Sequence, residues 1–147
     1  MKKLETLIKA EVERMEVLSI VKTLYLPDCY VAAGFIRNLV WDHIFSTSTP
    51  LNDIDIVFFD PLDISNSRAK EITSQLNERF SDFKWQAKNQ AFMHHRNHDR
   101  PYKNTLDAMS FWPEKETAIG VSLDNNGALT FINAFPLNNI FDGKMQA

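Results

Sequence analysis

The apolar positions along the chain repeat with two different periods. Between residues 3 and 25 they recur every three or four positions, with Lys and Glu between them. This spacing predicts an amphipathic helix that ends at Pro27-Asp28, since a residue before proline leaves the helical region. The same period predicts helices over residues 35–45 and 67–80.

Short apolar runs between these helices predict strands. The runs are "CYVAAG" (29–34), "IDIVFFD" (54–60), "DFKWQAKNQAF" (82–92), "TAIGVSL" (117–123) and "ALTFINAF" (128–135). The last two flank "DNNG", which predicts a hairpin with Gly127 in the turn. A short helix or turn is expected over "TLDAMSFW". Because no repeat or linker interrupts the pattern, we expect one α+β or α/β domain over residues 1–147.

Composition narrows the class of protein. The chain has 147 residues, of which 44% are hydrophobic and 24% charged, as in ordinary globular domains. A net charge of −3 gives no bulk attraction to nucleic acid, so any anion site must be local. The single cysteine, Cys29, excludes an internal disulfide framework. With no signal peptide and no apolar run of membrane-spanning length, we expect a cytoplasmic protein that does not enter a membrane.

Two aspartates stand at the start of the strand in "LNDIDIVFFD". Residues two apart in a strand point to the same face, so the carboxylates of Asp53 and Asp55 share a face. Two neighbouring carboxylates repel each other and are costly to bury without a neutralising partner. Mg²⁺ is one such partner, because it prefers oxygen ligands. A turn at Asn52-Asp53, with Asp55 paired to an arginine, is the structural alternative.

A possible anion site precedes this pair in "VAAGFIRNLVWD". Gly34 lies at the junction of a predicted strand and helix. The free N–H groups of a helix start favour anions, and glycine lets a phosphate approach the backbone. Arg37, one turn further on, can reach the same phosphate. An anion site followed by a carboxylate pair is the order that nucleotide chemistry needs.

These segments resemble the opening of the nucleotidyltransferase superfamily, which has the DNA polymerase β-like catalytic fold. The likeness is to the Gly-Gly-x-x-Arg-Asp…Asp-x-Asp arrangement of tRNA nucleotidyltransferases and poly(A) polymerases. More narrowly, most of residues 25–142 resembles a family of small bacterial nucleotidyltransferase-like proteins. The segments that carry this likeness are "AGFIRNLVWD", "LNDIDIVFFD", "WQAKNQAFMH", "PYKNTLDAMSFWPE" and "TAIGVSL". That family usually continues further, so the chain is expected to lack a C-terminal tail.

The resemblance implies an α+β fold with a mixed sheet packed with helices. It also implies that Asp53 and Asp55 are catalytic ligands of Mg²⁺, and that Gly34 and Arg37 bind the nucleotide phosphates. The reaction would transfer a nucleoside monophosphate from a nucleoside triphosphate (NTP) to an acceptor hydroxyl, releasing pyrophosphate. The acceptor stays open: RNA, a protein or a small molecule.

The chain departs from the superfamily pattern in two places. Ala33-Gly34-Phe35 replaces the usual Gly-Gly or Gly-Ser, and Phe35 is bulky for a phosphate site. Active members also carry a third carboxylate on a neighbouring strand, but "FKWQAKNQAF" has no acid and holds Lys88 instead. Asp107 is the best substitute, with Glu114 behind it. A third catalytic carboxylate at Asp107 is therefore expected if the chain is an enzyme.

Two classes of function follow from these features. The first is a Mg²⁺-dependent nucleotidyltransferase, with nucleotide hydrolysis as a weaker variant. The second is a non-catalytic nucleotide- or protein-binding module that keeps the fold. A third carboxylate near the pair favours the enzyme, whereas a salt bridge from Lys88 to the pair favours the binding module.

The central basic segment, residues 84–103, allows further interpretations. It either holds a triphosphate or RNA, or is a solvated face. The histidines in "HHRNH" could form a metal cluster, although no regular ligand spacing supports this.

Overall fold

The protein, seen in a computed structural model that describes residues 2–94 and 99–135, is built around a mixed five-stranded sheet of order β3-β2-β1-β4-β5. The α-helices of the described residues are α1 (Lys2–Lys9), α2 (Val12–Lys22), α3 (Gly34–Phe45), α4 (Ser67–Arg79) and α6 (Thr105–Met109). The strands are β1 (Tyr30–Ala32), β2 (Asp53–Phe58), β3 (Lys84–Asn89), β4 (Ile119–Leu123) and β5 (Leu129–Asn133). Short 3₁₀ helices are η1 (Gln90–Phe92) and η2 (Lys115–Thr117).

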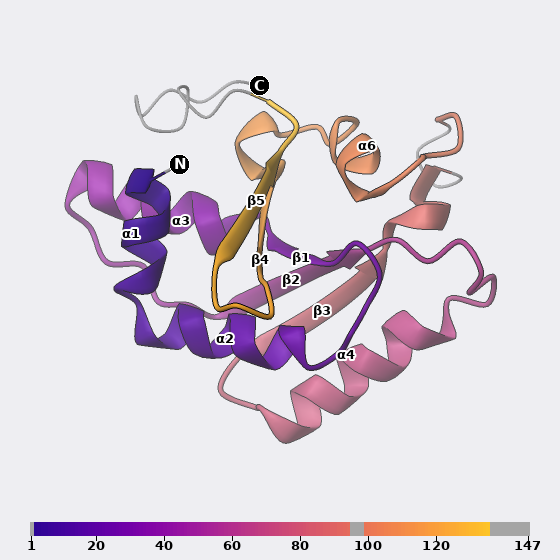
Figure 1. Cartoon of the computed structure of the whole chain (residues 1–147), viewed down its shortest axis with the longest axis horizontal. Coiled ribbons are helices and arrows are strands. Elements are labelled where there is room, and N and C mark those ends of the chain that lie inside the picture. The colour runs from indigo at the N-terminus through magenta and orange to yellow at the C-terminus, as the bar shows by residue number, and fades with distance from the viewer. Residues whose placement is uncertain (1, 95–98, 136–147) are drawn as a thin grey trace.

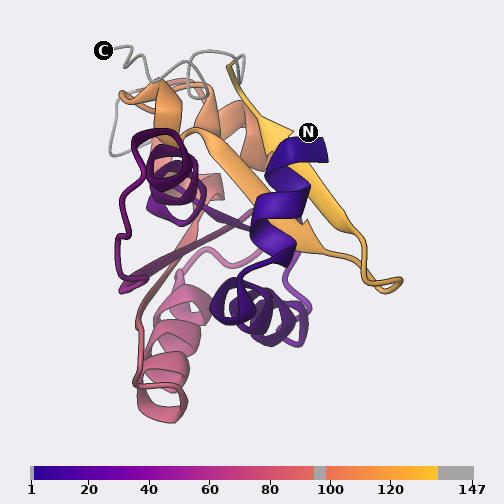
Figure 2. The same cartoon turned by 90° about the vertical axis from the view of Figure 1, so that its left-hand side faces the viewer.

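The sheet has one fully covered face and one partly covered face. Helices α2 and α4 lie on the same side of the sheet, and α6 lies on the other (Figures 1 and 2). The larger core cluster joins α1, α2, α3 and α4 to apolar side chains of the sheet, including the buried Ile54, Ile56 and Trp85. A smaller cluster on the opposite face, around Val57 and Met109, lies under α6. This arrangement confirms the expected α+β fold with a mixed sheet packed with helices. In the described part of the chain, no helix has the length and apolarity that crossing a membrane requires.

The helix predicted over residues 3–25 is wrong in one respect, because it is two helices. α1 ends at Lys9 and α2 begins at Val12, with the backbone of Glu11 extended. The break lets both pieces bury their apolar side chains, including Leu4 and Ile8 of α1, which are fully buried. A straight helix of that length would extend past the core. Between Ile8 and Met15 the buried residue is the charged Arg14.

The direction and register of the central strands decide which side chains share a face. β2 pairs antiparallel with β1 and parallel with β3. Along β2, Ile54 and Ile56 are buried on the helix-covered face, while Asp53 is exposed and Asp55 half-buried on the other. The carboxylates therefore share a face at the start of the strand, as the sequence predicted, and that face is the more open one.

The outer edge of β3 is closed by side chains of α4. The Asn77 side chain accepts a hydrogen bond from the Trp85 N–H (2.9 Å) and donates one to the Trp85 carbonyl (2.9 Å). The Thr73 hydroxyl accepts from the Ala87 N–H (2.9 Å). These bonds satisfy backbone groups that an edge strand would otherwise leave open. They also fix β3 beside β2.

We predict that Asn77→Ala lowers the free energy of unfolding by about 1–3 kcal/mol, because it leaves two backbone groups of Trp85 without partners. Urea denaturation measures the change. Gln75→Ala, at an exposed position of the same helix, is the matched control and is expected to stay within about 0.5 kcal/mol of wild type. Equal effects of the two substitutions would contradict the edge-closing role.

Candidate functional site

Four of the residues singled out from the sequence line one cavity of about 370 Å³. These are Gly34, Arg37, Asp53 and Asp55. The rest of the lining comes from Ala33, Asn38, Thr117 and the loop residues Thr49, Pro50, Leu51 and Asn52. The possible anion site and the carboxylate pair, which the sequence places in successive elements, thus face the same space.

The antiparallel register of β1 and β2 explains this meeting. Ala32, the last residue of β1, lies opposite Asp55, near the start of β2. The chain leaves β1 at Ala32 and begins α3 two residues later at Gly34. The first turn of α3 is therefore held next to the carboxylates by strand pairing.

The backbone at the start of α3 has an unusual conformation. Ala33 has φ 61° and ψ −129°, a region that glycine adopts easily and other residues rarely. A Cβ added at Gly34 would lie 3.2 Å from Nδ2 of Asn38 and 3.6 Å from a guanidinium nitrogen of Arg37. The superfamily's glycine preference thus has a local reason here, and Ala33 occupies the position where the backbone itself favours glycine.

Phe35 does not obstruct the cavity, contrary to the concern raised by its size. Its side chain is buried in the core, and its ring lies 5.4 Å from the guanidinium carbon of Arg14. Arg14, itself buried, donates from Nε to the Phe35 carbonyl (2.9 Å) and pairs with Glu11 (2.7 Å). Arg14 therefore holds the first turn of α3 from behind, a role that the sequence pattern did not indicate.

The loop that forms the wall opposite α3 is organised by one carboxylate. Asp42 accepts hydrogen bonds from the Thr47 hydroxyl (2.6 Å), the Thr49 hydroxyl (2.7 Å) and the Thr49 N–H (2.7 Å). These bonds hold the segment before Asp53 against the end of α3. Asp42 was not singled out from the sequence, because its partners follow it only through a loop.

Arg37 already has partners at the mouth of the cavity. Its guanidinium lies 3.5 Å from a carboxylate oxygen of Glu114, and Nε donates to the Asn38 side chain (3.2 Å). The guanidinium carbon lies 5.0 Å from the centre of the Trp41 ring. Glu114 is largely exposed, so this ion pair is weak and leaves Arg37 available to an anion.

The carboxylate pair carries uncompensated negative charge. Among the described residues, neither Asp53 nor Asp55 has a salt-bridge partner within 4.0 Å. Partial burial raises the pKa of Asp55; the positive charge of Lys88 opposes this rise, the charge of Asp53 adds to it, and Arg37 opposes it. Lys88 thus influences the pair through space without forming the salt bridge that would have favoured a binding module.

The pair fits a hard divalent cation by its chemistry. It offers carboxylate oxygens on one strand face without protein cations bonded to them, and Mg²⁺ is commonly held by one or two carboxylates together with substrate phosphates. Within residues 2–94 and 99–135, however, no group of three or more His, Cys, Asp or Glu side chains is placed to hold a metal ion.

Asp107 is not brought to the pair. Arg100 binds its carboxylate with two hydrogen bonds of 2.8 Å, and the Lys103 N–H donates a third (2.9 Å). The hydrogen bonds from Arg100 lower the pKa of Asp107 to about 2. This carboxylate is engaged in a local structure and lines a different pocket.

The position of α6 explains why Asp107 lies elsewhere. Thr105 is bonded to Asp28 through its N–H (2.8 Å) and its hydroxyl (2.7 Å). Asp28 precedes β1, and the start of β1 pairs with the end of β2. α6 is therefore tied to the opposite end of β2 from Asp53. Glu114, the second choice from the sequence, is the acid that reaches the cavity mouth, through Arg37.

The central basic segment divides into separate parts. Lys84 and Lys88 lie on β3, on the same face as the carboxylate pair, whereas Arg100 pairs with Asp107. His95, Arg96 and His98 lie outside the described residues, so the proposed histidine cluster stays a prediction. Of the described residues in this segment, the two lysines of β3 bear on the site.

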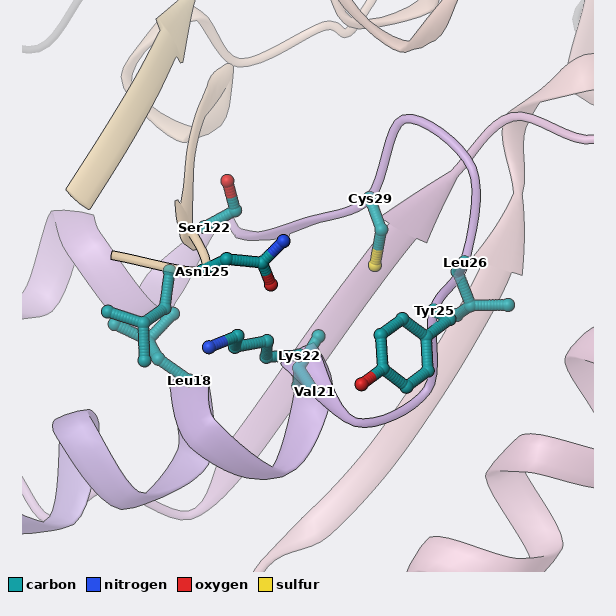
Figure 3. A pocket seen from close by; sticks show the side chains of 9 residues that line it. Leu18, Val21, Lys22, Tyr25, Leu26, Cys29, Ser122 and Asn125 are labelled. Atoms are coloured by element: carbon teal, nitrogen blue, oxygen red, sulfur yellow. The ribbon is translucent and has the colours of Figure 1, made fainter. Parts of the chain in front are cut away.

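A second cavity, of about 230 Å³, lies between the end of α2 and the β4–β5 hairpin (Figure 3). Cys29, Lys22 and Tyr25 line it together with apolar and amide side chains, and none of its lining residues is an acid. Burial, with a smaller contribution from Asp28, raises the pKa of the Cys29 thiol to about 12. At neutral pH this thiol is protonated and a poor nucleophile. The cavity therefore offers no carboxylate that could hold a divalent cation.

We predict that Ala33→Gly raises the free energy of unfolding by about 1 kcal/mol, because relief of the positive-φ strain outweighs the entropy that glycine loses on folding. Ala33→Val is expected to lower stability, because a β-branched residue fits this conformation worse still. Urea denaturation of both variants provides the test. A loss of stability in Ala33→Gly would show that the backbone conformation of this residue is not strained.

We predict that Asp55→Asn stabilises the metal-free protein at pH 7. Because the folded-state pKa of Asp55 is raised above 3.8, ionisation disfavours the folded state, and the gain should fade as the pH falls toward that value. Asp107→Asn is the control of opposite sign: it should destabilise at pH 7, with the loss fading between pH 3.8 and about 2. Unfolding free energies measured in EDTA from pH 7 down to about pH 2 test both predictions. Destabilisation by Asp55→Asn at pH 7 would contradict the burial argument.

Comparison with known proteins agrees with this geometry. A family model described as "Nucleotidyltransferase" matches residues 19–147. The chain is also similar to a protein described in the words "The NMR structure of the protein reveals a CCA-adding enzyme head domain". The two are 31% identical with a TM-score of 0.85, and the match covers 96% of this chain and 75% of that one. No curated protein matches. With the family match spanning most of the sequence and the fold shared along nearly all of it, the chain belongs to the nucleotidyltransferase family.

Proposed function

We propose that the protein is a Mg²⁺-dependent nucleotidyltransferase that transfers a nucleoside monophosphate from an NTP to an acceptor hydroxyl. The observation that carries this proposal is the shared cavity, which faces the start of α3 and the carboxylate pair together. Family membership supports an NTP as the donor. The two halves of the cavity have the complementary chemistry that a triphosphate and a divalent cation require.

The donor phosphates are expected to lie at the start of α3. Backbone N–H groups of a helix start attract anions, and Gly34 leaves room for a phosphate to approach them. Arg37 adds a positive charge on the same wall, since its only acidic partner, among the described residues, is the exposed Glu114 at 3.5 Å. The loop that Asp42 holds forms the opposite wall of the cavity.

Asp53 and Asp55 would hold the Mg²⁺. When bound, the ion neutralises the pair and the nucleotide phosphates and polarises the phosphoryl group that is transferred. Asp55, the more buried of the two, is fixed by its pairing with β1 and β3. Asp53, at the exposed start of β2, remains open to solvent and to an acceptor.

A second candidate function is nucleotide binding without transfer. It is favoured by the described residues having no third carboxylate beside the pair. Release of pyrophosphate separates the two candidates. The similarity to a CCA-adding head domain makes the 3′ end of an RNA the first acceptor to test.

We predict that the protein binds at least one of ATP, GTP, CTP and UTP only when Mg²⁺ is present. Asp53→Asn and Asp55→Asn should each weaken this binding by at least about tenfold, because each removes a charged ligand oxygen. Calorimetry with Mg²⁺ or with EDTA measures the binding, and pyrophosphate release in the presence of RNA measures the transfer.

Asp82→Asn is the matched control, since it removes an exposed carboxylate that lines neither pocket beside the pair. It should bind as the wild type does. Metal-independent binding, or binding unchanged by both site substitutions, would contradict the proposed function. Binding without pyrophosphate release from any acceptor would favour the second candidate.

A further inference from the structure

The carboxylate pair also borders a third pocket, which lies on the side of β2 away from α3. This pocket, of about 720 Å³, is lined by Asp53 and Asp55 of β2, Lys84 and Gln86 of β3, and Thr73 and Asn77 of α4, with a contribution from Trp85. The pocket with Gly34 and Arg37 lies on the β1 side of β2, and this one lies on the β3 side. The pair is thus the wall that the two pockets share.

The parallel register of β2 and β3 decides which side chains line the pocket on the β3 side. Asp53 lies opposite Lys84, and Asp55 lies opposite Gln86. Burial alternates along β3, with Trp85 buried on the helix-covered face and Lys84 and Gln86 exposed on the other. A lysine and an amide therefore stand directly beside the two carboxylates, on the same face.

The fold does not use the charge of Lys84. Its ammonium has no salt-bridge partner within 4.0 Å among the described residues. Its backbone N–H donates to the Asn52 carbonyl (2.7 Å). Lys88 lies four residues further along β3, and its charge acts on Asp55 through space. Lys84, nearer the open start of the strand, is available to a ligand.

An anionic acceptor would need such a cation. It must approach two carboxylates and a bound triphosphate, which repel it, and a lysine beside the pair offsets that repulsion. A neutral alcohol would gain nothing from a lysine there. The position of Lys84 therefore favours an anionic acceptor over a neutral one.

We propose that the pocket between β2, β3 and α4 binds the acceptor, and that the acceptor carries a phosphate held by Lys84 and Gln86 close to its reactive hydroxyl. This assignment rests on the proposed function. In the reaction, the hydroxyl oxygen forms a bond to the α-phosphorus of the NTP, and the bond from that phosphorus to the bridging oxygen breaks. Pyrophosphate leaves with the electron pair, and the hydroxyl proton passes by way of Asp53 to water.

The test uses the whole chain saturated with Mg²⁺ and a non-hydrolysable analogue of whichever NTP binds. Calorimetry then measures the binding of three probes: a short RNA with a free 3′ hydroxyl, glycerol 3-phosphate, and glycerol. Binding of the RNA alone identifies a polynucleotide acceptor, and binding of glycerol 3-phosphate identifies a small phosphate ester. In either case glycerol should bind far more weakly.

Lys84→Met should weaken the binding of the phosphate-bearing probe by about tenfold or more, because a charge-assisted hydrogen bond is lost. Lys84→Glu should weaken it further. Lys70→Met, at an exposed position of α4 that does not line the pocket, is the matched control and should bind as the wild type does. Thermal melting confirms that each variant is folded.

Three results would overturn the acceptor assignment: binding of the phosphate-bearing probe unchanged in Lys84→Met, glycerol binding as tightly as the phosphate-bearing probe that binds best, or no binding of either phosphate-bearing probe. If the nucleotide analogue binds normally in these experiments, the proposed function stands and only the acceptor assignment fails. If no nucleotide binds to the wild type, both fail together.

Discussion

The pairing of Ala32 with Asp55 is the constraint on which the site depends. It joins the end of one strand to the start of its antiparallel neighbour, so that the helix after the first strand begins where the second strand begins. A shift of this register by one residue would turn both carboxylates to the helix-covered face, where Ile54 and Ile56 now pack. The buried alternation along β2 therefore protects the geometry of the polar site on its other face.

Charge around the site is arranged unequally, and the core supports that arrangement. The carboxylate pair has no bonded cation among the described residues, while Lys84 and Lys88 on the next strand have no bonded anion there. Direct pairing would have been easily available to side chains on adjacent strands. Their separation leaves both signs of charge exposed to ligands, which suits a site where a cation and several phosphates must meet. Arg14 and Asp42 hold the surrounding backbone from outside both pockets, and Asn77 holds β3 from the wall of the pocket beside it.

Much of this was predictable from periodicity and local chemistry. The alternation in "DIDIVFF" placed the carboxylates on one face, and the pattern in "VAAGFIRN" predicted the strand-to-helix junction at Gly34. What could not be predicted depends on contacts between distant segments. The break at Glu11 follows from how two helices share a core, and the distance of Asp107 from the pair follows from the bond between Thr105 and Asp28. The strain at Ala33 depends on a backbone angle that no side-chain pattern encodes.

The closing of the β3 edge by Asn77 and Thr73 has a consequence for the behaviour of the protein in solution. A strand with open backbone groups recruits strands of other molecules, and here such recruitment would cover Lys84 and Gln86 at the rim of the site. By occupying those groups, α4 stops the sheet from growing in that direction. Self-association through β-strands is left to the opposite edge, at β5, away from the carboxylates. Even where many copies of the protein meet, their strands would pair at β5, and the site beside β3 would stay accessible.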